Sequence, residues 1–279
     1  MYTTSTQTFV IYSNIPVDLD QAYTRLTSGN FVTDGEILSC KFKQRDATHA
    51  SCLNCLTISL HIKKPPVSEN EIAQVPPKSN RGRKPLKIKP SGKVLNVKLF
   101  RNGSTQVTGC KTIDHVKFSM DMVYNLLDFD RVDEFHIVSI MNNVNFSVNF
   151  KINRERLGAY LIEKGINVPP ITSGYMGIKI RIPSLVDKND LRVPRMSWSK
   201  TDGFTSLSSV PYVHFFADKP KKIDKVFSTC IGIFQNGKIL MTSLDGHTTD
   251  VMYKYITNLL EEARPFIEVR EKIVKTFKR

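Results

Sequence analysis

The sequence has few acidic residues and no long apolar run. Asp and Glu number 26 against 40 Lys and Arg, which gives a formal net charge of +14 over 279 residues. No stretch of about 18 apolar residues occurs, so we expect no membrane-spanning segment. The first residues, Met1 to Gln7, are polar and uncharged and do not resemble a signal peptide. We therefore expect an intracellular protein with a polyanionic partner, nucleic acid ahead of an anionic membrane surface.

The residue patterns of an enzyme or a metal protein are also missing. The six histidines show no metal-ligand spacing, and neither a Gly-rich phosphate loop nor a nucleophile elbow occurs. Cys52 and Cys55 have the spacing of half a zinc site, but they lie in an alternating stretch that predicts a buried strand. An odd number of cysteines, five, favours free thiols. We expect no enzyme activity, no cofactor, no metal and no small-molecule substrate.

What the sequence does contain is one nine-residue pattern, Phe-x-Asn-Gly-x-x-x-x-Thr, in two copies. The copies begin at Phe100 and Phe234, so they are separated by nearly half the chain. An Asn-Gly pair between strand-forming residues is a strong hairpin signal, because both central turn residues adopt positive φ. Two such hairpins half a chain apart predict an internal duplication.

Other landmarks recur at nearly the same spacing as the two phenylalanines. Asp18 and Asn153 are candidate helix N-caps, and their separation matches that of the motif to within one position. The tripeptide Asn-Leu-Leu begins at Asn125 and again at Asn258, also within one position of the motif spacing, and each copy ends a stretch with helical periodicity. The helices expected from these signals cover residues 19–26, 115–127, 154–164 and 248–263.

Each half therefore predicts a strand, a helix, several strands with the Asn-Gly hairpin, and a long helix. This is an α+β unit, an antiparallel sheet with its helices on one face. We expect two repeats, residues 1–132 and 133–279, in a pseudo-symmetric molecule with one shared curved surface. Residues 63–93 form a basic, proline-rich insertion with nine Lys and Arg against two Glu, which we expect to be flexible. Residues 183–222 form a second insertion, which contains the only tryptophan.

With these features the sequence resembles the TATA-binding protein family, particularly its divergent members encoded by large DNA viruses. The motif that carries the resemblance is an aromatic residue, a hairpin of small residues and a Thr, in Phe100 to Cys110 and in Phe234 to Ser243. The resemblance covers most of residues 6–129 and 137–264. It implies a saddle of two pseudo-repeats with helices on the convex face. The concave sheet would lie on the DNA minor groove, with apolar side chains wedged between base steps.

The resemblance implies which side chains meet the DNA. Phe100 and Phe234 correspond to wedges, and Tyr175 replaces the aromatic that accompanies Phe234. The residue that accompanies Phe100 is Cys55 or, after a shift of two, Leu53, and because neither is aromatic we predict a weaker kink at that end. The resemblance further implies groove or phosphate contacts from Gln106, Thr108, Leu240, Thr242, Arg181 and Lys238, and base contacts from Asn143 and its first-half counterpart Thr8.

Two alternatives are open at these positions. Asn142 or Asn145 is an alternative to Asn143 for the base contact. Phe100 and Phe234 are alternatively buried core residues, which duplication alone would preserve.

The basic insertion contains a second candidate DNA contact. Arg81-Gly82-Arg83 resembles the core of an AT-hook, whose two arginines enter a narrow A·T minor groove. Lys84 separates Arg83 from Pro85, whereas the usual core has Pro directly after the second Arg. A nonspecific phosphate-binding tract or a nuclear-import tract is an equal alternative.

The resemblance, together with the positive charge, implies a minor-groove protein that binds A·T-rich double-stranded DNA and nucleates transcription initiation. Initiation factors or RNA polymerase would be its protein partners, in the nucleus or at a viral transcription site in the host cytoplasm. The alternative is a nonspecific DNA-architectural or virion-assembly protein with the same fold. An accessory module of an enzyme is a third reading.

Overall fold

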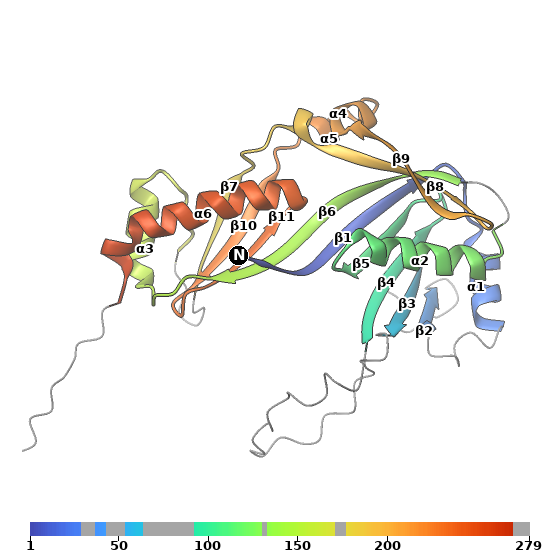
Figure 1. Cartoon of the computed structure of the whole chain (residues 1–279), viewed down its shortest axis with the longest axis horizontal. Helices are drawn as coiled ribbons and strands as arrows, with labels where there is room; N and C mark the ends of the chain where they lie inside the picture. The colour runs from blue at the N-terminus through green and yellow to red at the C-terminus, as the bar shows by residue number, and fades with distance from the viewer. Residues whose placement is uncertain (29–36, 43–53, 64–91, 130–132, 171–176, 270–279) are drawn as a thin grey trace, which may run out of the picture. The chain divides into compact units, whose positions relative to one another are not determined.

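The computed structural model describes residues 1–28, 37–42, 54–63, 92–129, 133–170 and 177–269 (Figure 1). The chain divides into two compact units, which we call unit 1 and unit 2. Unit 1 comprises Met1–Val10, His136–Met196 and Ser206–Arg279, and unit 2 comprises Ile11–Phe135 and Ser197–Thr205.

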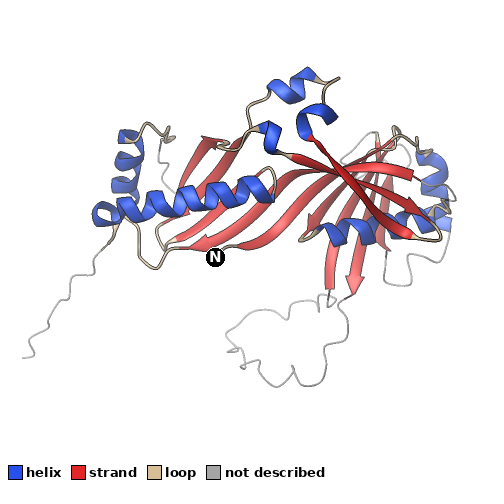
Figure 2. Cartoon of the chain, turned by 45° about the horizontal axis from the view of Figure 1, so that its top comes forward, coloured by secondary structure: helices blue, strands red, loops and turns tan. Residues whose placement is uncertain are grey.

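The helices and strands of the described residues follow one another as an α+β chain (Figures 1 and 2). In the first half they are β1 (Thr3–Ser13), α1 (Leu19–Ser28), β2 (Ile37–Phe42), β3 (Cys55–Lys63), β4 (Gly92–Phe100), β5 (Thr105–Cys110) and α2 (Ile113–Leu126). In the second half they are β6 (Asp133–Ser147), α3 (Arg154–Glu163), β7 (Gly177–Pro183), η3 (Lys188–Asp190), β8 (Arg192–Ser199), β9 (Gly203–Pro211), α4 (Tyr212–Phe215), α5 (Pro220–Asp224), β10 (Ser228–Phe234), β11 (Lys238–Ser243) and α6 (Gly246–Ile267).

The predicted fold class, α+β with antiparallel sheets, is confirmed. In unit 2 the strand order is β2-β3-β4-β5, and each neighbouring pair is antiparallel. In unit 1 the order is β6-β11-β10-β7, again with antiparallel pairs. The four helices expected from the sequence all form, as α1, α2, α3 and α6.

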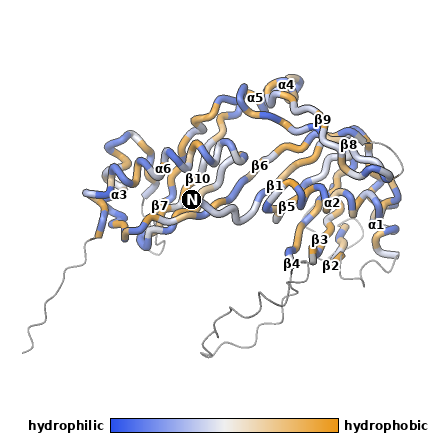
Figure 3. The backbone as a smooth tube through the Cα atoms, in the orientation of Figure 1, coloured by the Kyte–Doolittle hydropathy of each residue, from blue (hydrophilic) through white to orange (hydrophobic). Residues whose placement is uncertain are grey.

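In unit 1 the hydrophobic core lies between one face of the sheet and helices α3 and α6. Along β7 the alternate residues Ile178, Ile180 and Ile182 are buried, as a strand with one covered face requires. Helix α6 has a buried residue every three or four positions, and the alternation of hydropathy along it can be followed in Figure 3. Each fully buried Ile or Leu contributes roughly 1.5–3 kcal/mol. The helix residues that pack on the strands include Leu157, Leu161, Met252, Ile256 and Leu260.

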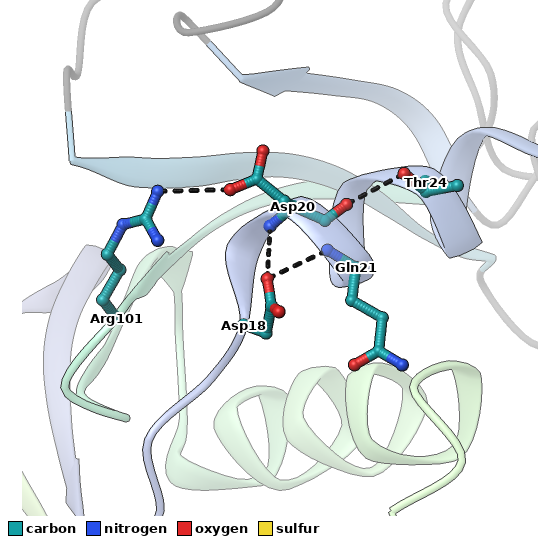
Figure 4. Close-up of polar contacts among 5 residues, drawn as sticks. All are labelled: Asp18, Asp20, Gln21, Thr24 and Arg101. Atoms are coloured by element: carbon teal, nitrogen blue, oxygen red, sulfur yellow. Dashed lines mark hydrogen bonds and ion pairs between the residues drawn. The ribbon is translucent and has the colours of Figure 1, made fainter.

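Helix α1 begins where the sequence predicts, at an aspartate cap (Figure 4). Oδ1 of Asp18 accepts hydrogen bonds from the backbone N–H groups of Asp20 at 2.9 Å and Gln21 at 3.1 Å. Arg101, from the β4–β5 hairpin, lies 3.3 Å from the Asp20 carboxylate. In α3 the corresponding cap is Asn153, whose Oδ1 accepts from the Arg156 N–H at 3.0 Å. The same local signal therefore starts the first helix in both halves.

Each Asn-Gly hairpin docks on the segment before its helix through the same backbone hydrogen bond. In unit 2 the N–H of Val17 donates to the carbonyl of Arg101 at 3.1 Å. In unit 1 the N–H of Ile152 donates to the carbonyl of Gln235 at 2.9 Å. The two donors, and likewise the two acceptors, are separated by the spacing of the motif phenylalanines to within one position. A shared tertiary contact at the spacing of the sequence motif is what internal duplication predicts.

The hairpin glycines make this docking possible. Gly103 has φ of +81° and Gly237 has φ of +80°, a region that favours glycine. Asn102 and Asn236 do not adopt positive φ, so the expectation that both central turn residues would do so is wrong. A Cβ on Gly103 would lie 2.1 Å from the carbonyl oxygen of Ile15. A Cβ on Gly237 would lie 2.7 Å from the carbonyl oxygen of Phe150. Glycine is therefore required both by the turn and by the close approach of the next segment.

We expect Gly237→Ala to lower the free energy of unfolding by about 2 kcal/mol, because the new Cβ adds a backbone clash to the strain of positive φ. Gly165→Ala is the matched control, since Gly165 has φ of +74° but no atom within 4 Å of the added Cβ. It should lose only the strain, about 1 kcal/mol. Denaturant unfolding measures both variants, and equal losses would contradict a docking role for Gly237.

The second insertion is folded. Residues 183–222 contain β8, β9, α4 and the start of α5, elements that the sequence patterns did not predict. Its buried residues in unit 1 include Leu191, Tyr212 and Phe216. Of the basic insertion, residues 64–91 lie outside the described residues.

One expectation about the cysteines is wrong. Cys55 is disulfide-bonded, whereas Cys40, Cys110 and Cys230 form no disulfide. The odd cysteine count was a poor guide, because it requires only that at least one thiol stays unpaired. The alternating stretch around Cys55 does form the predicted strand, as β3. In the part of the chain that the structure describes, no helix is long and apolar enough to cross a membrane.

Candidate nucleic-acid interface

In each unit the sheet has one face opposite to its hydrophobic core, and we call it the outer face. In unit 1 it is visible in β7, where Lys179 and Arg181 are exposed between the buried isoleucines. The strand registers extend it as two cross-strand rows. The first row is Asn143, Thr242, Cys230 and Arg181, and the second is Asn145, Leu240, Gly232 and Lys179.

In the first row the two predicted polar residues contact each other. The hydroxyl of Thr242 donates a hydrogen bond of 2.7 Å to Oδ1 of Asn143. Ser5, from β1, donates to the backbone carbonyl of Asn143 at 3.0 Å. With its oxygen accepting from Thr242, the amide of Asn143 directs its NH₂ donors elsewhere. A half-buried Asn with its oxygen engaged is suited to meet an acceptor on a ligand.

The second row places an apolar side chain between polar ones. Leu240 is 51% exposed, which is unusual for a leucine in a sheet centre. Its cross-strand neighbours are Asn145 on one side and Gly232 on the other. Lys179 ends the row on β7. Leu240 therefore offers apolar contact to whatever covers this face.

Phe234 closes the outer face of unit 1 at the hairpin. It pairs with Gly177 in the register of β10 and β7, and it is half-buried. A Cβ on Gly177 would lie 3.1 Å from Cδ1 of Phe234, so the ring sits close to the glycine backbone. Lys238, the first residue of β11, is exposed beyond the same turn. The aromatic and the cation predicted from the motif thus belong to one hairpin.

Unit 2 has a corresponding outer face with two rows of its own. In the first row Asn96 pairs with Ser59 and Thr108. The hydroxyl of Ser59 donates a hydrogen bond of 3.0 Å to Oδ1 of Asn96, and the hydroxyl of Thr108 donates one of 3.5 Å to its backbone carbonyl. Phe100 pairs with Cys55 at the hairpin end. Both Phe100 and Thr108 are half-buried, like their counterparts in unit 1. The other row is Lys41, Thr57, Lys98 and Gln106.

Two predicted contact residues are buried. Thr8 is 2% exposed, and its hydroxyl has no hydrogen-bond partner among the described residues. Cys55 is 1% exposed. Neither side chain reaches the surface of the structure, in contrast to Asn143 and Leu240. The predicted residues Tyr175, Arg81 and Arg83, and Leu53 as the alternative to Cys55, lie outside the described residues.

Further polar residues of the outer faces were missed in the sequence, among them Lys179, Asn96 and Lys41. Lys179 is two residues before Arg181 and Asn96 is four before Phe100, so strand alternation alone would have placed both on these faces. The position of Lys41 follows only from the pairing of β2 with β3. No group of three or more His, Cys, Asp or Glu in the described ranges is placed to hold a metal ion.

No protein-family model matches the sequence, and no curated protein matches it. Among solved structures, one described as "Methanococcus jannaschii TBP" is similar to this chain with a TM-score of 0.49 and 10% sequence identity. The superposition covers 94% of this chain and 98% of that one.

Proposed function

We propose that the outer faces bind double-stranded DNA in the manner of a TATA-binding protein, in the minor groove of A·T-rich sequences. The observation that most supports this is the Thr242–Asn143 hydrogen bond in the middle of the outer face of unit 1. It holds an amide whose free donors match the acceptors that A·T pairs present in the minor groove.

The residues around this pair support the same choice of groove. Guanine adds an amine to the minor groove, which opposes both an Asn donor and close apolar contact. Leu240, exposed in the adjacent row, would meet that amine. A face of apolar and donor side chains therefore favours A·T pairs over G·C pairs.

The cations of the outer face would bind phosphates. Lys179 and Arg181 are exposed on β7, where the two rows end, and Lys238 is exposed at the start of β11. Phosphate contacts position a protein on the duplex and add affinity that falls with salt. The net charge of +14 acts in the same direction for the whole chain.

On this proposal the protein nucleates transcription initiation, with initiation factors or RNA polymerase as partners. It would act in the nucleus or at a viral transcription site in the host cytoplasm, as the resemblance to the viral members suggests. The second candidate is a nonspecific DNA-architectural or virion-assembly protein, which the charge of +14 alone would favour. Neither candidate requires a catalytic group.

A competition assay separates the two candidates. The protein is bound to a labelled A·T-rich duplex and challenged with unlabelled A·T-rich or G·C-rich duplex at two salt concentrations. Minor-groove readout predicts that the unlabelled A·T-rich duplex displaces the labelled duplex more effectively than the G·C-rich one at both salt concentrations. Equal competition with a steep salt dependence would favour the architectural role.

Removing the hydroxyl that orients Asn143 should weaken this preference. We expect Thr242→Val to reduce affinity for the A·T-rich duplex about tenfold, or about 1.4 kcal/mol, with a smaller change for the G·C-rich duplex. Thr257→Val is the matched control, because that half-buried hydroxyl also makes a hydrogen bond, of 2.8 Å to the Tyr253 carbonyl, but lies on α6. If both variants bind A·T-rich DNA like the parent, Asn143 is not the reading residue.

A further inference from the structure

Strand β9 is an edge strand with one long side unpaired. Its only partner among the described strands is β8 (Figure 1). The five consecutive residues from Thr205 to Ser209 are all exposed, so neither face of this stretch is covered. An open edge presents a row of backbone N–H and C=O groups to any other extended chain.

This edge lacks the features with which proteins usually prevent pairing. Edge strands are commonly protected by lysine, by proline or by an inward charge. From Gly203 to Val213 no residue is charged, although 24% of the whole chain is. The one proline of the strand, Pro211, is its last residue and leaves the exposed stretch uninterrupted. The exposed stretch is therefore competent to accept a further strand.

The sequence of the stretch is complementary to itself. In an antiparallel pair centred on Leu207, that leucine faces its own copy, and Ser206 faces Ser208. Thr205 then faces Ser209, so every cross-strand pair joins residues of the same kind. Hydroxyl pairs and apolar pairs directly opposite each other stabilise antiparallel strands. A charged peptide would find no ion-pair partner on this stretch, which makes a second copy the better fit.

We propose that two copies of this protein associate through β9, paired antiparallel about a two-fold axis at Leu207. The same patch serves both subunits, as closed two-fold symmetry requires. A single strand pair is small beside a standard interface of about 1,600 Å², so the dimer is weak. Because each copy carries a net charge of +14, charge repulsion opposes dimer formation. Salt screens this repulsion and therefore strengthens the dimer. This is the reverse of the salt effect on DNA binding.

Sedimentation velocity of the full chain without DNA tests the proposal. The protein is followed from about 1 μM to about 1 mM, the range of a weak association, at about 0.1 M and about 1 M salt. We expect a monomer–dimer equilibrium that shifts toward dimer at high salt. A monomer at every concentration, or a dimer that salt dissociates, would overturn the proposal. No DNA is present, so this result is independent of the proposed function.

Two matched variants locate the interface. Leu207→Lys places two charges opposite each other and should weaken the dimer at least tenfold. Leu185→Lys makes the same change at an exposed leucine outside β9 and should leave the dimer intact. Fluorescence of Trp198, the only tryptophan, checks that the β8–β9 hairpin stays folded. A dimer that Leu207→Lys does not weaken, or that both variants weaken equally, counts against β9.

Cysteine crosslinking tests the register. Leu207→Cys should form a dimer-linking disulfide under mild oxidation, because residues directly opposite have Cβ atoms about 4.5–5.5 Å apart. In the Ser209→Cys variant the new cysteine lies opposite Thr205 of the other copy, not opposite a second cysteine, so this variant should crosslink much less. The parent protein, in which Cys40, Cys110 and Cys230 form no disulfide, gives the background. Equal crosslinking of both variants would rule out the Leu207-centred pair.

Discussion

Replacing Trp198 by alanine is expected to lower the free energy of unfolding by about 3–5 kcal/mol. Trp198 is 1% exposed, and its ring contacts Tyr124 at 4.8 Å and Phe129 at 6.4 Å between centroids. Its indole N–H donates to Asp121 of α2 at 2.9 Å. Alanine removes both the aromatic packing and this hydrogen bond. The size of the loss reflects a large buried side chain that no neighbour can replace.

The location of Trp198 gives the prediction a local readout. Residues Ser197–Thr205 come from the second half of the sequence but belong to unit 2. The variant should therefore raise hydrogen exchange in α2, while α6 of unit 1 keeps its protection. Trp198→Phe keeps most of the ring packing and should lose less than the alanine variant. A loss below about 1 kcal/mol for Trp198→Ala would show that the hairpin rests loosely on α2.

The ion pairs next to Trp198 contribute much less to the free energy of unfolding. Lys200, in the β8–β9 turn, and Arg25 of α1 both bind the Asp128 carboxylate, at 2.8 Å and 3.1 Å. Hydrogen bonds from Lys200 and then Arg25 lower the pKa of Asp128 below its ordinary value. All three side chains are largely exposed, so water and salt screen the ion pairs. The stability of this region depends on Trp198 rather than on Asp128.

The parts of the fold that the sequence predicted are those set by neighbouring residues. The Asn-Gly turns and the caps Asp18 and Asn153 act within a few positions, and each produced the expected hairpin or helix. The packing of Trp198 on Asp121 joins residues 77 positions apart, and no local pattern records it. The strands of the second insertion were missed for the same reason, because β9 alternates in neither hydropathy nor burial.

The candidate site shows the same division. The motif located Phe234, Lys238 and Thr242, which lie on one hairpin. Asn143 was predicted too, but its contact with Thr242 follows from the register of β11 with β6, which is a pairing of distant segments. For Thr8, counting back along the sequence by the repeat spacing led to a residue that is buried. A spacing transfers positions between repeats but does not show how deeply each of them is buried.

The double replacement Lys179→Ala/Arg181→Ala is expected to reduce DNA affinity roughly 50- to 100-fold at low salt. Both residues are exposed on the outer face of unit 1, on the same side of β7. If each binds one phosphate, the slope of log affinity against log salt should fall by about 1.8, because each contact contributes about 0.9. Binding measured by fluorescence anisotropy across a salt series gives both quantities.

Arg156→Ala/Lys254→Ala is the matched control, because it removes the same charge from exposed residues on α3 and α6. These helices cover the opposite face of the unit 1 sheet. A nonspecific attraction to the chain's overall charge would lower affinity equally in both doubles, since both reduce the net charge by two. Contact through the outer face predicts a large loss of affinity and slope for the β7 double alone. The comparison therefore decides whether DNA meets the outer face or only the charge of the molecule.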